Sequence, residues 1–215
     1  HAASPHVLDL RYSDNSQVLD SQIINNTLSG FSGLYAYQSD SLTVSGNAIT
    51  GNNGIGVDAR YSPYLNLSRN TITGNSSYGV FLFYSSHYAT LSDNTIATNS
   101  YGVYLDGGPD HVTLQHNTIS GNNNRGISGD TGSEYLSLVA NTIAGNNGDG
   151  VYLPGGTNHL LDNNLIARNG GDGIEWGWGS GVLRHNTLSG NSSDSGLRVT
   201  GSASLVLTNT IIANQ

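Results

Sequence analysis

Hydrophobic and polar positions alternate along this chain in short segments that recur at a nearly fixed distance. Residues 42–44, 112–114 and 136–138 each read apolar, polar, apolar. A second kind of segment begins with Gly and an aliphatic residue and continues the alternation, as in residues 79–83 and 102–105. A period of two residues is typical of a β-strand with one buried face. The pattern therefore predicts short strands, and no segment keeps the 3.6-residue period of a helix.

Asparagine marks the repeat. A phrase of Asn, usually Thr, then Ile or Leu recurs nine times at intervals of 21 to 24 residues, with a second Asn five positions after the first. The first Asn of each phrase is Asn26, Asn47, Asn70, Asn94, Asn117, Asn141, Asn164, Asn186 or Asn209. The second is Asn52, Asn75, Asn99, Asn122, Asn146, Asn169, Asn191 or Asn214, and the first phrase departs from this with Phe31.

A repeat of this length indicates a solenoid in which each repeat forms one coil. Three strands per coil, joined at Asn and Gly turns, predict an all-β parallel β-helix of about nine to ten coils. Asn tolerates the left-handed conformation of a tight bend, and stacked Asn amides satisfy each other's hydrogen bonds. We expect residues 1–17 to form an irregular N-terminal segment with a partial first coil. Residues 18–215 would then form a single β-helix domain without a cap at either end.

These Asn-Thr-Ile and Gly-aliphatic repeats resemble the right-handed parallel β-helix repeat of pectate lyases, alginate epimerases and other carbohydrate-binding and sugar-hydrolysing proteins. The resemblance extends from about Val18 to Asn214. It implies the fold, and it leaves the activity open because the same fold carries many activities.

Composition narrows the classes of partner. The net charge is −8, and only 10% of residues are charged. These values argue against nucleic acid as a partner, because nucleic acid is bound by basic patches. No apolar run approaches the roughly 20 residues that span a bilayer. The chain has no Cys, which excludes a disulfide scaffold. It begins His1-Ala2-Ala3, as expected after removal of a signal peptide, so we expect an extracellular or cell-surface protein.

Alignment of the repeats on the Gly positions brings outward side chains into columns. One column reads Tyr35, Asp58, Phe81, Tyr104, Ser128, Tyr152, Glu175, Arg198. The next reads Tyr37, Arg60, Phe83, Asp106, Asp130, Pro154, Gly177, Thr200. With Trp176 and Trp178 nearby, these aromatic residues could stack on sugar rings, or they could pack laterally against another molecule. Both interpretations stay open at this point.

Carboxylates gather in two adjacent repeats. Asp106 and Asp130 share one column, and Asp110 and Glu134 share another. Four oxygen ligands on one edge would suit Ca²⁺, two neighbouring carboxylates could serve as an acid/base pair, and solvated turn residues would explain them equally well. Calcium is the cofactor that this pattern suggests, if there is one.

Two further columns carry charges of both signs at the spacing of one coil. Arg69, Asp93 and His116 precede the first Asn in three consecutive repeats, and Arg125, Asp149 and Asp172 precede the Gly in three others. We expect salt bridges there, each contributing under about 1 kcal/mol.

The sequence gives no catalytic residue. Enzymes of the similar families have long insertions beside a substrate groove, whereas the repeat spacing here stays within 21 to 24 residues. The Tyr-Gly-Phe-Asp-Pro-His signature of the epimerases has only separated counterparts, residues 101–103 and 109–111. Such enzymes typically have a Lys or Arg near paired carboxylates; Lys is absent here, and Arg60 and Arg198 are the only basic residues in the two outward columns.

The sequence favours a secreted structural protein whose copies stack head to tail into an extracellular filament. A solenoid with open ends exposes apolar side chains and strand edges. The residues expected at the two junctions are Val7, Leu8, Leu10, Thr210, Ile211 and Ile212. The alternative is a polysaccharide-binding or polysaccharide-modifying β-helix that uses the aromatic face and the carboxylate edge. Its partner would be a glycan rather than another copy. A piece of a longer adhesin or phage fibre is a third interpretation.

Overall fold

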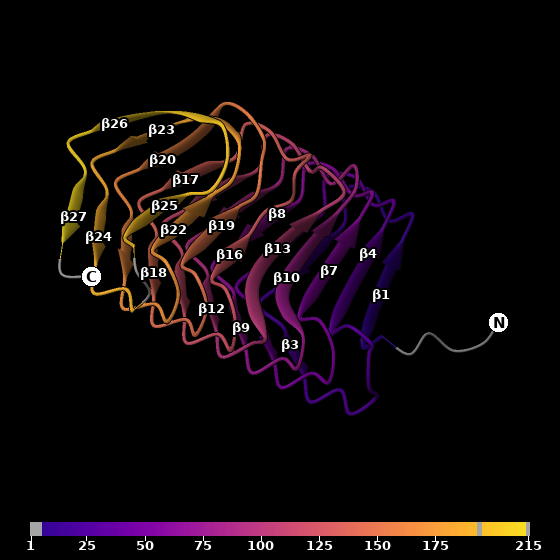
Figure 1. The fold of residues 1–215 in the computed structure, drawn as a ribbon. Coiled ribbons are helices and arrows are strands. Elements are labelled where there is room, and N and C mark those ends of the chain that lie inside the picture. The colour runs from indigo at the N-terminus through magenta and orange to yellow at the C-terminus, as the bar shows by residue number, and fades with distance from the viewer. Residues whose placement is uncertain (1–5, 193–194, 214–215) are drawn as a thin grey trace.

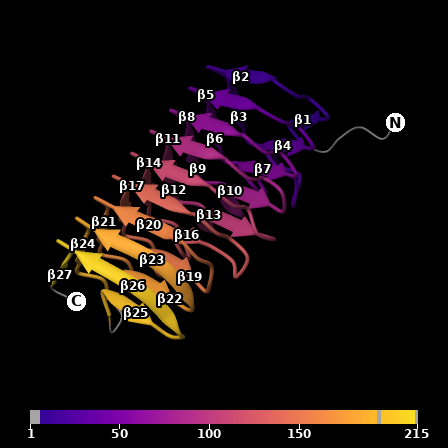
Figure 2. The same cartoon turned by 90° about the horizontal axis from the view of Figure 1, so that it is seen from above.

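A computed structural model describes residues 6–192 and 195–213. They form 27 short strands in three parallel sheets of nine strands each, so the chain winds through nine coils. Figure 1 shows the coils stacked side by side, and Figure 2 shows the same stack from above. The prediction of a parallel β-helix with three strands per coil is confirmed. No helix in the described part of the chain is long and apolar enough to span a membrane.

Sheet A contains the first strand of every coil. Its strands are β1 Leu8–Arg11, β4 Leu34–Tyr37, β7 Val57–Arg60, β10 Tyr78–Phe83, β13 Tyr101–Asp106, β16 Ile127–Ser128, β19 Val151–Leu153, β22 Ile174–Trp176 and β25 Leu197–Val199. Sheet B contains the second strand. Its strands are β2 Gln17–Leu19, β5 Thr43–Ser45, β8 Asn66–Ser68, β11 Thr90–Ser92, β14 Thr113–Gln115, β17 Ser137–Val139, β20 His159–Asp162, β23 Gly179–Arg184 and β26 Ala203–Thr208.

Sheet C contains the third strand and carries the Asn-Thr-Ile phrase. Its strands are β3 Gln22–Ile24, β6 Ala48–Thr50, β9 Thr71–Thr73, β12 Thr95–Ala97, β15 Thr118–Ser120, β18 Thr142–Ala144, β21 Leu165–Ala167, β24 Thr187–Ser189 and β27 Ile211–Ala213. Each coil directs its alternate aliphatic side chains inward, where Leu, Ile and Val form one continuous buried core along the axis. The core is the main source of stability, because burial of apolar area dominates folding.

Two asparagine ladders run along this core. One joins the side chains from Asn47 to Asn186, and the other joins those from Asn52 to Asn191. In each rung an amide Nδ2 donates to the Oδ1 of the next coil, and that Oδ1 also accepts the main-chain N–H of the first Asn. The ladders thus satisfy polar groups that are buried between the coils.

The first and last repeats correct the sequence alignment. Asn26 does not occupy the first Asn column, because its main-chain N–H donates to Asn52 Oδ1 at 3.1 Å and so places it in the second column. The first column is filled in that coil by Ser21, whose N–H donates to Asn47 Oδ1. In the last coil β24 pairs with β27 through Thr187 and Ile211, so the residue that follows Asn209 takes the Asn186 position. Asn214 lies outside the described residues.

The left-handed turn conformation also differs from the sequence interpretation. The ladder asparagines are not the residues with positive φ. The residue before each one is, as with Arg69 (φ 55°), His116 (φ 54°) and Ala140 (φ 52°). The left-handed conformation of the turn is therefore adopted by the residue before the Asn. The Asn keeps an ordinary backbone conformation and directs its side chain into the interior.

One of the two predicted salt-bridge columns forms. Arg125 Nε donates to Asp149 Oδ2 at 2.9 Å across one coil, as predicted. Arg69 instead donates to Ser45 Oγ at 2.9 Å, and no ion pair between Arg69 and Asp93 occurs among the described residues. Residues one coil apart are close enough to pair, but side-chain direction at a left-handed turn decides whether they do.

The strands at the two ends of the stack have a neighbour on one side only. Near the first coil, Val7 is exposed, whereas Leu8 and Leu10 pack against the core. In the last coil, Ile211 and Ile212 are exposed, and the Thr210 hydroxyl donates to Leu183 O. The residues expected at the junctions therefore lie on the outermost described coils.

Candidate functional site: the aromatic face of sheet A

The outward columns of sheet A have the register expected from the Gly alignment. Tyr35 pairs with Asp58, Asp58 with Phe81, and Phe81 with Tyr104. Side chains at paired positions of a parallel sheet lie one coil apart, about 4.8 Å. The aromatic residues of neighbouring coils are therefore close enough to contact each other.

Rings from four coils form one connected surface on sheet A, which we call the aromatic face. It consists of Tyr35, Tyr37, Tyr61, Tyr78, Phe81, Phe83, Tyr84, Tyr101 and Tyr104. The Tyr78 and Tyr104 rings are stacked with centroids 4.8 Å apart, and the Tyr61 and Tyr84 rings are stacked at 5.4 Å. Tyr61 and Tyr84 are among the exposed residues of the chain. A connected set of mostly part-exposed rings of this kind is a candidate interaction surface.

Two arginines lie among these rings, each paired with an aspartate. Arg60 Nε donates to Asp58 Oδ1 at 2.8 Å, and Arg11 Nε donates to Asp9 Oδ1 at 3.0 Å. The Arg60 guanidinium also lies 5.7 Å from the Tyr35 ring centroid. The hydrogen bond to Asp58 raises the pKa of Arg60 above its ordinary value. The face therefore presents hydrogen-bond donors held at fixed positions between apolar rings.

Burial also raises the pKa of three tyrosines on this face. For Tyr35, Tyr78 and Tyr104 the first cause is desolvation of the phenolate, so each pKa lies above its ordinary value. These hydroxyls stay protonated at neutral pH. They can donate hydrogen bonds as well as accept them.

Three of the eight residues expected to stack on sugars are buried or have one side of the ring covered by a neighbouring side chain. Trp176 is fully buried, because it occupies an inward position of β22 rather than an outward one. Phe81 is only 7% exposed, because neighbouring rings cover it. Arg125 lies 3.6 Å from the Tyr152 ring centroid and covers one side of that ring. Tyr35, Tyr37, Phe83, Tyr104 and Trp178 remain exposed or half-buried.

Four aromatic residues of the face are absent from the outward columns predicted from the sequence. Tyr61 and Tyr84 lie one repeat apart, as do Tyr78 and Tyr101. A second stack outside sheet A was also missed; it contains Tyr64, Tyr88, His111 and Tyr135, with ring centroids 4.4–5.1 Å apart. The repeat spacing of 23 or 24 residues was the signal for both sets. They fall at turns and strand starts, outside the columns that the Gly alignment follows.

Two of the four carboxylates considered as a calcium edge, those of Asp130 and Asp110, accept main-chain hydrogen bonds at turns. Both oxygens of Asp130 accept hydrogen bonds: Oδ2 from Gly108 N–H, and Oδ1 from the Gly132 and Ser133 N–H groups. Asp110 Oδ1 accepts the Glu134 N–H at 3.0 Å, which confirms that these two share a column. Asp106 follows Phe83 in its column on β13. No three of the four carboxylates bring their oxygens within 4.8 Å of one another.

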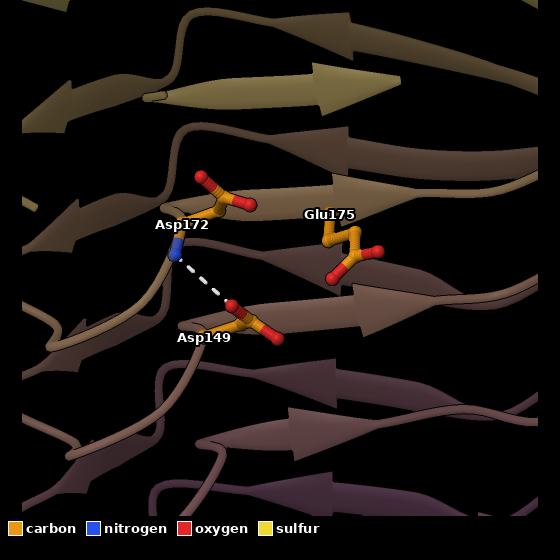
Figure 3. Close-up of side chains that lie close together, drawn as sticks. All are labelled: Asp149, Asp172 and Glu175. Carbon is orange, nitrogen blue, oxygen red and sulfur yellow. Dashed lines mark hydrogen bonds between the residues drawn. The ribbon is translucent and has the colours of Figure 1, made fainter. Parts of the chain in front are cut away.

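A different acidic cluster does meet this spacing. Asp149, Asp172 and Glu175 each place one carboxylate oxygen within 4.8 Å of the other two, the single such group of His, Asp or Glu among the described residues. Figure 3 shows the carboxylates of Asp149 and Asp172 one above the other, with that of Glu175 beside them. Asp149 and Asp172 precede β19 and β22 respectively, and Glu175 lies within β22.

A pocket of about 360 Å³ lies on another part of the surface, over β20, β23 and β26. His159 lines it, but the imidazole is 1% exposed and fully used. Its Nδ1 accepts the Leu136 N–H at 3.1 Å, and its Nε2 lies 3.1 Å from Gly155 O. This arrangement fits a neutral imidazole with its proton on Nε2, and burial lowers the pKa of His159. The ring is thus a structural element of the turn.

The chain belongs to the right-handed β-helix family, whose model matches residues 8–143 and 130–215. The resemblance inferred from the repeats is thereby confirmed, including the handedness of the coil. No curated protein matches the chain in sequence. Among solved structures, the periplasmic alginate epimerase AlgG is similar over 91% of this chain and 50% of its own, with 21% identity and a TM-score of 0.83.

A second similar structure is the A-module of the mannuronan C-5 epimerase AlgE4 of Azotobacter vinelandii. It covers 82% of this chain and 56% of its own, at 18% identity and a TM-score of 0.73. The AlgE6 A-module of the same organism has 14% identity and a TM-score of 0.56, over 88% of this chain and 71% of its own. This chain thus spans about half the length of AlgG. At such identities the similarity establishes the fold that these proteins share.

Proposed function

We propose that this chain binds a polysaccharide along the aromatic face of sheet A. The observation that carries the proposal is the connected row of rings over β4, β7, β10 and β13. Four coils advance about 14 Å along the axis, at about 4.8 Å per coil. This length accommodates several linked sugar rings, whose apolar faces stack on aromatic side chains.

The polar groups of the face suit the same ligand. Binding sites for small molecules and sugars combine apolar walls with a few fixed polar groups that set orientation. Here Arg60 and Arg11 provide N–H donors, and the tyrosine hydroxyls can donate or accept. Among the similar solved structures, AlgG is an alginate epimerase, and the AlgE4 and AlgE6 modules belong to mannuronan C-5 epimerases. These neighbours support a polysaccharide as the class of ligand.

Chemical modification of the bound polysaccharide is a second activity that can be tested on the same face. Tyr78 and Tyr104 carry raised pKa values because of burial, so neither is poised as a base at neutral pH. We therefore propose binding as the primary function. An epimerisation or elimination activity would show as a changed polymer after incubation.

A panel of polymers tests the proposal. Affinity electrophoresis through gels that contain alginate, polygalacturonate or a neutral glucan, each with and without Ca²⁺, would retard the protein if it binds. Nuclear magnetic resonance of the recovered polymers, together with ultraviolet absorbance from new C=C bonds, would reveal modification. Retardation by at least one polymer supports the proposal. Unretarded migration in every gel would contradict it.

Head-to-tail stacking into a filament stays a prediction that the comparisons do not support. The exposed Ile211 and Ile212 of the last described coil would be covered by a second copy. They would be covered equally well by further coils of a longer chain. Sedimentation of the protein over a range of concentrations distinguishes a self-associating chain from a monomer.

We also propose that the chain acts outside the cytoplasm. AlgG is described as periplasmic, and long polysaccharides are encountered in the envelope and beyond it. The chain has no Cys, so an oxidising compartment would find no thiol to oxidise. Fractionation of the native source, with detection of the protein in the envelope or medium, checks this location.

A further inference from the structure

We propose that Asp149, Asp172 and Glu175 form a binding site for a divalent cation, with Ca²⁺ as the preferred ion. The cluster lies at the start of β19 and β22, which are two and three coils beyond β13, the last strand of the aromatic face. The proposed cation site does not depend on polysaccharide binding. It differs from the carboxylate edge that the sequence suggested.

The first observation is the spacing of the oxygens. One oxygen from each of the three carboxylates lies within 4.8 Å of the others. Two ligands on one Ca²⁺ ion, with bonds of about 2.3–2.6 Å, lie at most about 5 Å apart. A single ion can therefore contact all three side chains in the arrangement that Figure 3 shows.

The second observation is independent of the spacing. Asp172 is 2% exposed, and its Oδ1 has no hydrogen-bond partner among the described residues. A buried carboxylate oxygen without a partner is costly, and native structures rarely leave one unexplained. A cation held between the carboxylates would provide the missing interaction.

The neighbouring arginines neutralise the cluster only in part. Arg125 Nε bonds Asp149 Oδ2 at 2.9 Å, but Arg198 Nη1 lies 3.6 Å from Asp172 Oδ2, beyond hydrogen-bond distance. Asp149 Oδ1 already accepts the Asp172 N–H at 3.0 Å and retains a second lone pair. The carboxylate of Glu175 makes no hydrogen bond or ion pair with the described residues. Three carboxylates thus face two guanidinium groups, and one negative charge remains.

These features indicate the ion and its affinity. All three ligands are hard carboxylate oxygens, which suit Ca²⁺ and Mg²⁺ rather than zinc or copper. Mg²⁺ needs shorter bonds and near-octahedral geometry, whereas Ca²⁺ accepts irregular ligand sets completed by water. Because two arginines reduce the local negative charge, we expect a Kd on the order of 10⁻⁴ to 10⁻³ M, as in extracellular calcium modules.

Calcium titration of matched variants tests the site. Isothermal titration and the Ca²⁺-dependent rise in Tm would be measured for the wild type, Glu175→Gln and Glu134→Gln. The Glu175→Gln variant should bind Ca²⁺ at least tenfold more weakly. The Glu134→Gln variant changes the same residue type on the sequence-predicted edge and should bind like the wild type. Mg²⁺ should compete poorly.

Three results would overturn the proposal. They are no saturable Ca²⁺ binding by the wild type, equal affinity in Glu175→Gln, or loss of binding in Glu134→Gln alone. Arg198→Gln provides a second variant, because Arg198 is largely exposed. Removal of its positive charge should tighten Ca²⁺ binding, and an unchanged or weaker affinity would count against the site.

Discussion

Asn117 and Asn141 are joined across one coil by two hydrogen bonds, one from the main chain and one from the side chain of Asn117, to a single oxygen of the Asn141 side chain. Asn141 Oδ1 accepts the main-chain N–H of Asn117 at 2.9 Å and its Nδ2 at 3.0 Å. Asn117 Nδ2 also donates to Leu91 O at 2.8 Å. One amide therefore connects three successive coils. The repeated Asn is thus committed to the fold, which leaves function to the outward residues.

The substitution Asn117→Ala removes a buried rung. It leaves Leu91 O and Asn141 Oδ1 each short of a donor, and Asn94 loses the acceptor of its N–H and Nδ2. Buried unsatisfied groups cost about 1–3 kcal/mol each, so we expect a loss of about 3 kcal/mol or more. Urea unfolding followed by circular dichroism measures it. The exposed Asn123→Ala should change stability by less than about 0.5 kcal/mol, and equal losses in both variants would refute the ladder's role.

Gly126, which precedes strand β16, is required by close packing between coils. A Cβ on Gly126 would lie 2.7 Å from Gly150 O and 2.7 Å from Ile143 Cγ2. Gly126→Ala should therefore cost about 3 kcal/mol through overpacking. Gly145 has φ +65° and open space around its Cα, so Gly145→Ala should cost about 1–2 kcal/mol. Thermal unfolding of the two variants compares them, and a smaller cost at Gly126 than at Gly145 would contradict the packing argument.

His159 should make the protein less stable as the pH decreases below neutrality. Burial lowers the folded pKa of His159 below its ordinary value of 6.5, although the Gly155 carbonyl and Glu134 oppose the shift. Above pH 6.5 both folded and unfolded states hold a neutral ring, so His159 contributes no pH dependence there. Below it, the unfolded chain takes up a proton that the folded ring resists, and stability is lost progressively until the folded pKa is reached.

The measurement is the fall in Tm between pH 7.5 and pH 5. His159→Gln should show a smaller fall than the wild type, because it removes one proton-linked group. His116→Asn alters an exposed turn imidazole and provides the matched control. A fall of the same size in wild type and His159→Gln would show that the buried imidazole is not responsible.

The sequence was sufficient for the coil and for most of its columns. Alternation and a fixed repeat determine which residues share a column, so the pairing of Phe81 with Tyr104 could be predicted. The register of the first repeat could not be predicted. Asn26 is aligned in space with Asn52, one longer coil away, whereas the repeat spacing in the sequence aligned it with Asn47. In the last repeat Thr210 occupies the position of the ladder Asn, so the alignment on Asn209 was wrong by one residue.

The site was less predictable than the fold. Outward direction alone suggested that Phe81 could bind a ligand, yet the rings of adjacent coils cover it. Trp176 is an inward residue of a strand that the repeat pattern places correctly, so its burial follows from the alternation itself. The cluster of Glu175 with Asp149 and Asp172 joins two columns. Such a cluster depends on side-chain direction, which a column alignment does not contain.

Polysaccharide binding on the aromatic face is tested most directly by removing the rings of Tyr78 and Tyr104. They stack at 4.8 Å on adjacent strands and both remain half-buried. Tyr64 and Tyr135 are exposed tyrosines of the other stack. A double Ala variant at those two positions therefore controls for loss of two tyrosines elsewhere.

Calorimetric titration with the polymer that retards the wild type most strongly compares three proteins. We expect saturable binding by the wild type, affinity at least tenfold lower in Tyr78→Ala/Tyr104→Ala, and wild-type affinity in Tyr64→Ala/Tyr135→Ala. Equal affinity in all three proteins, or loss of binding only in the Tyr64→Ala/Tyr135→Ala protein, would contradict binding on the aromatic face.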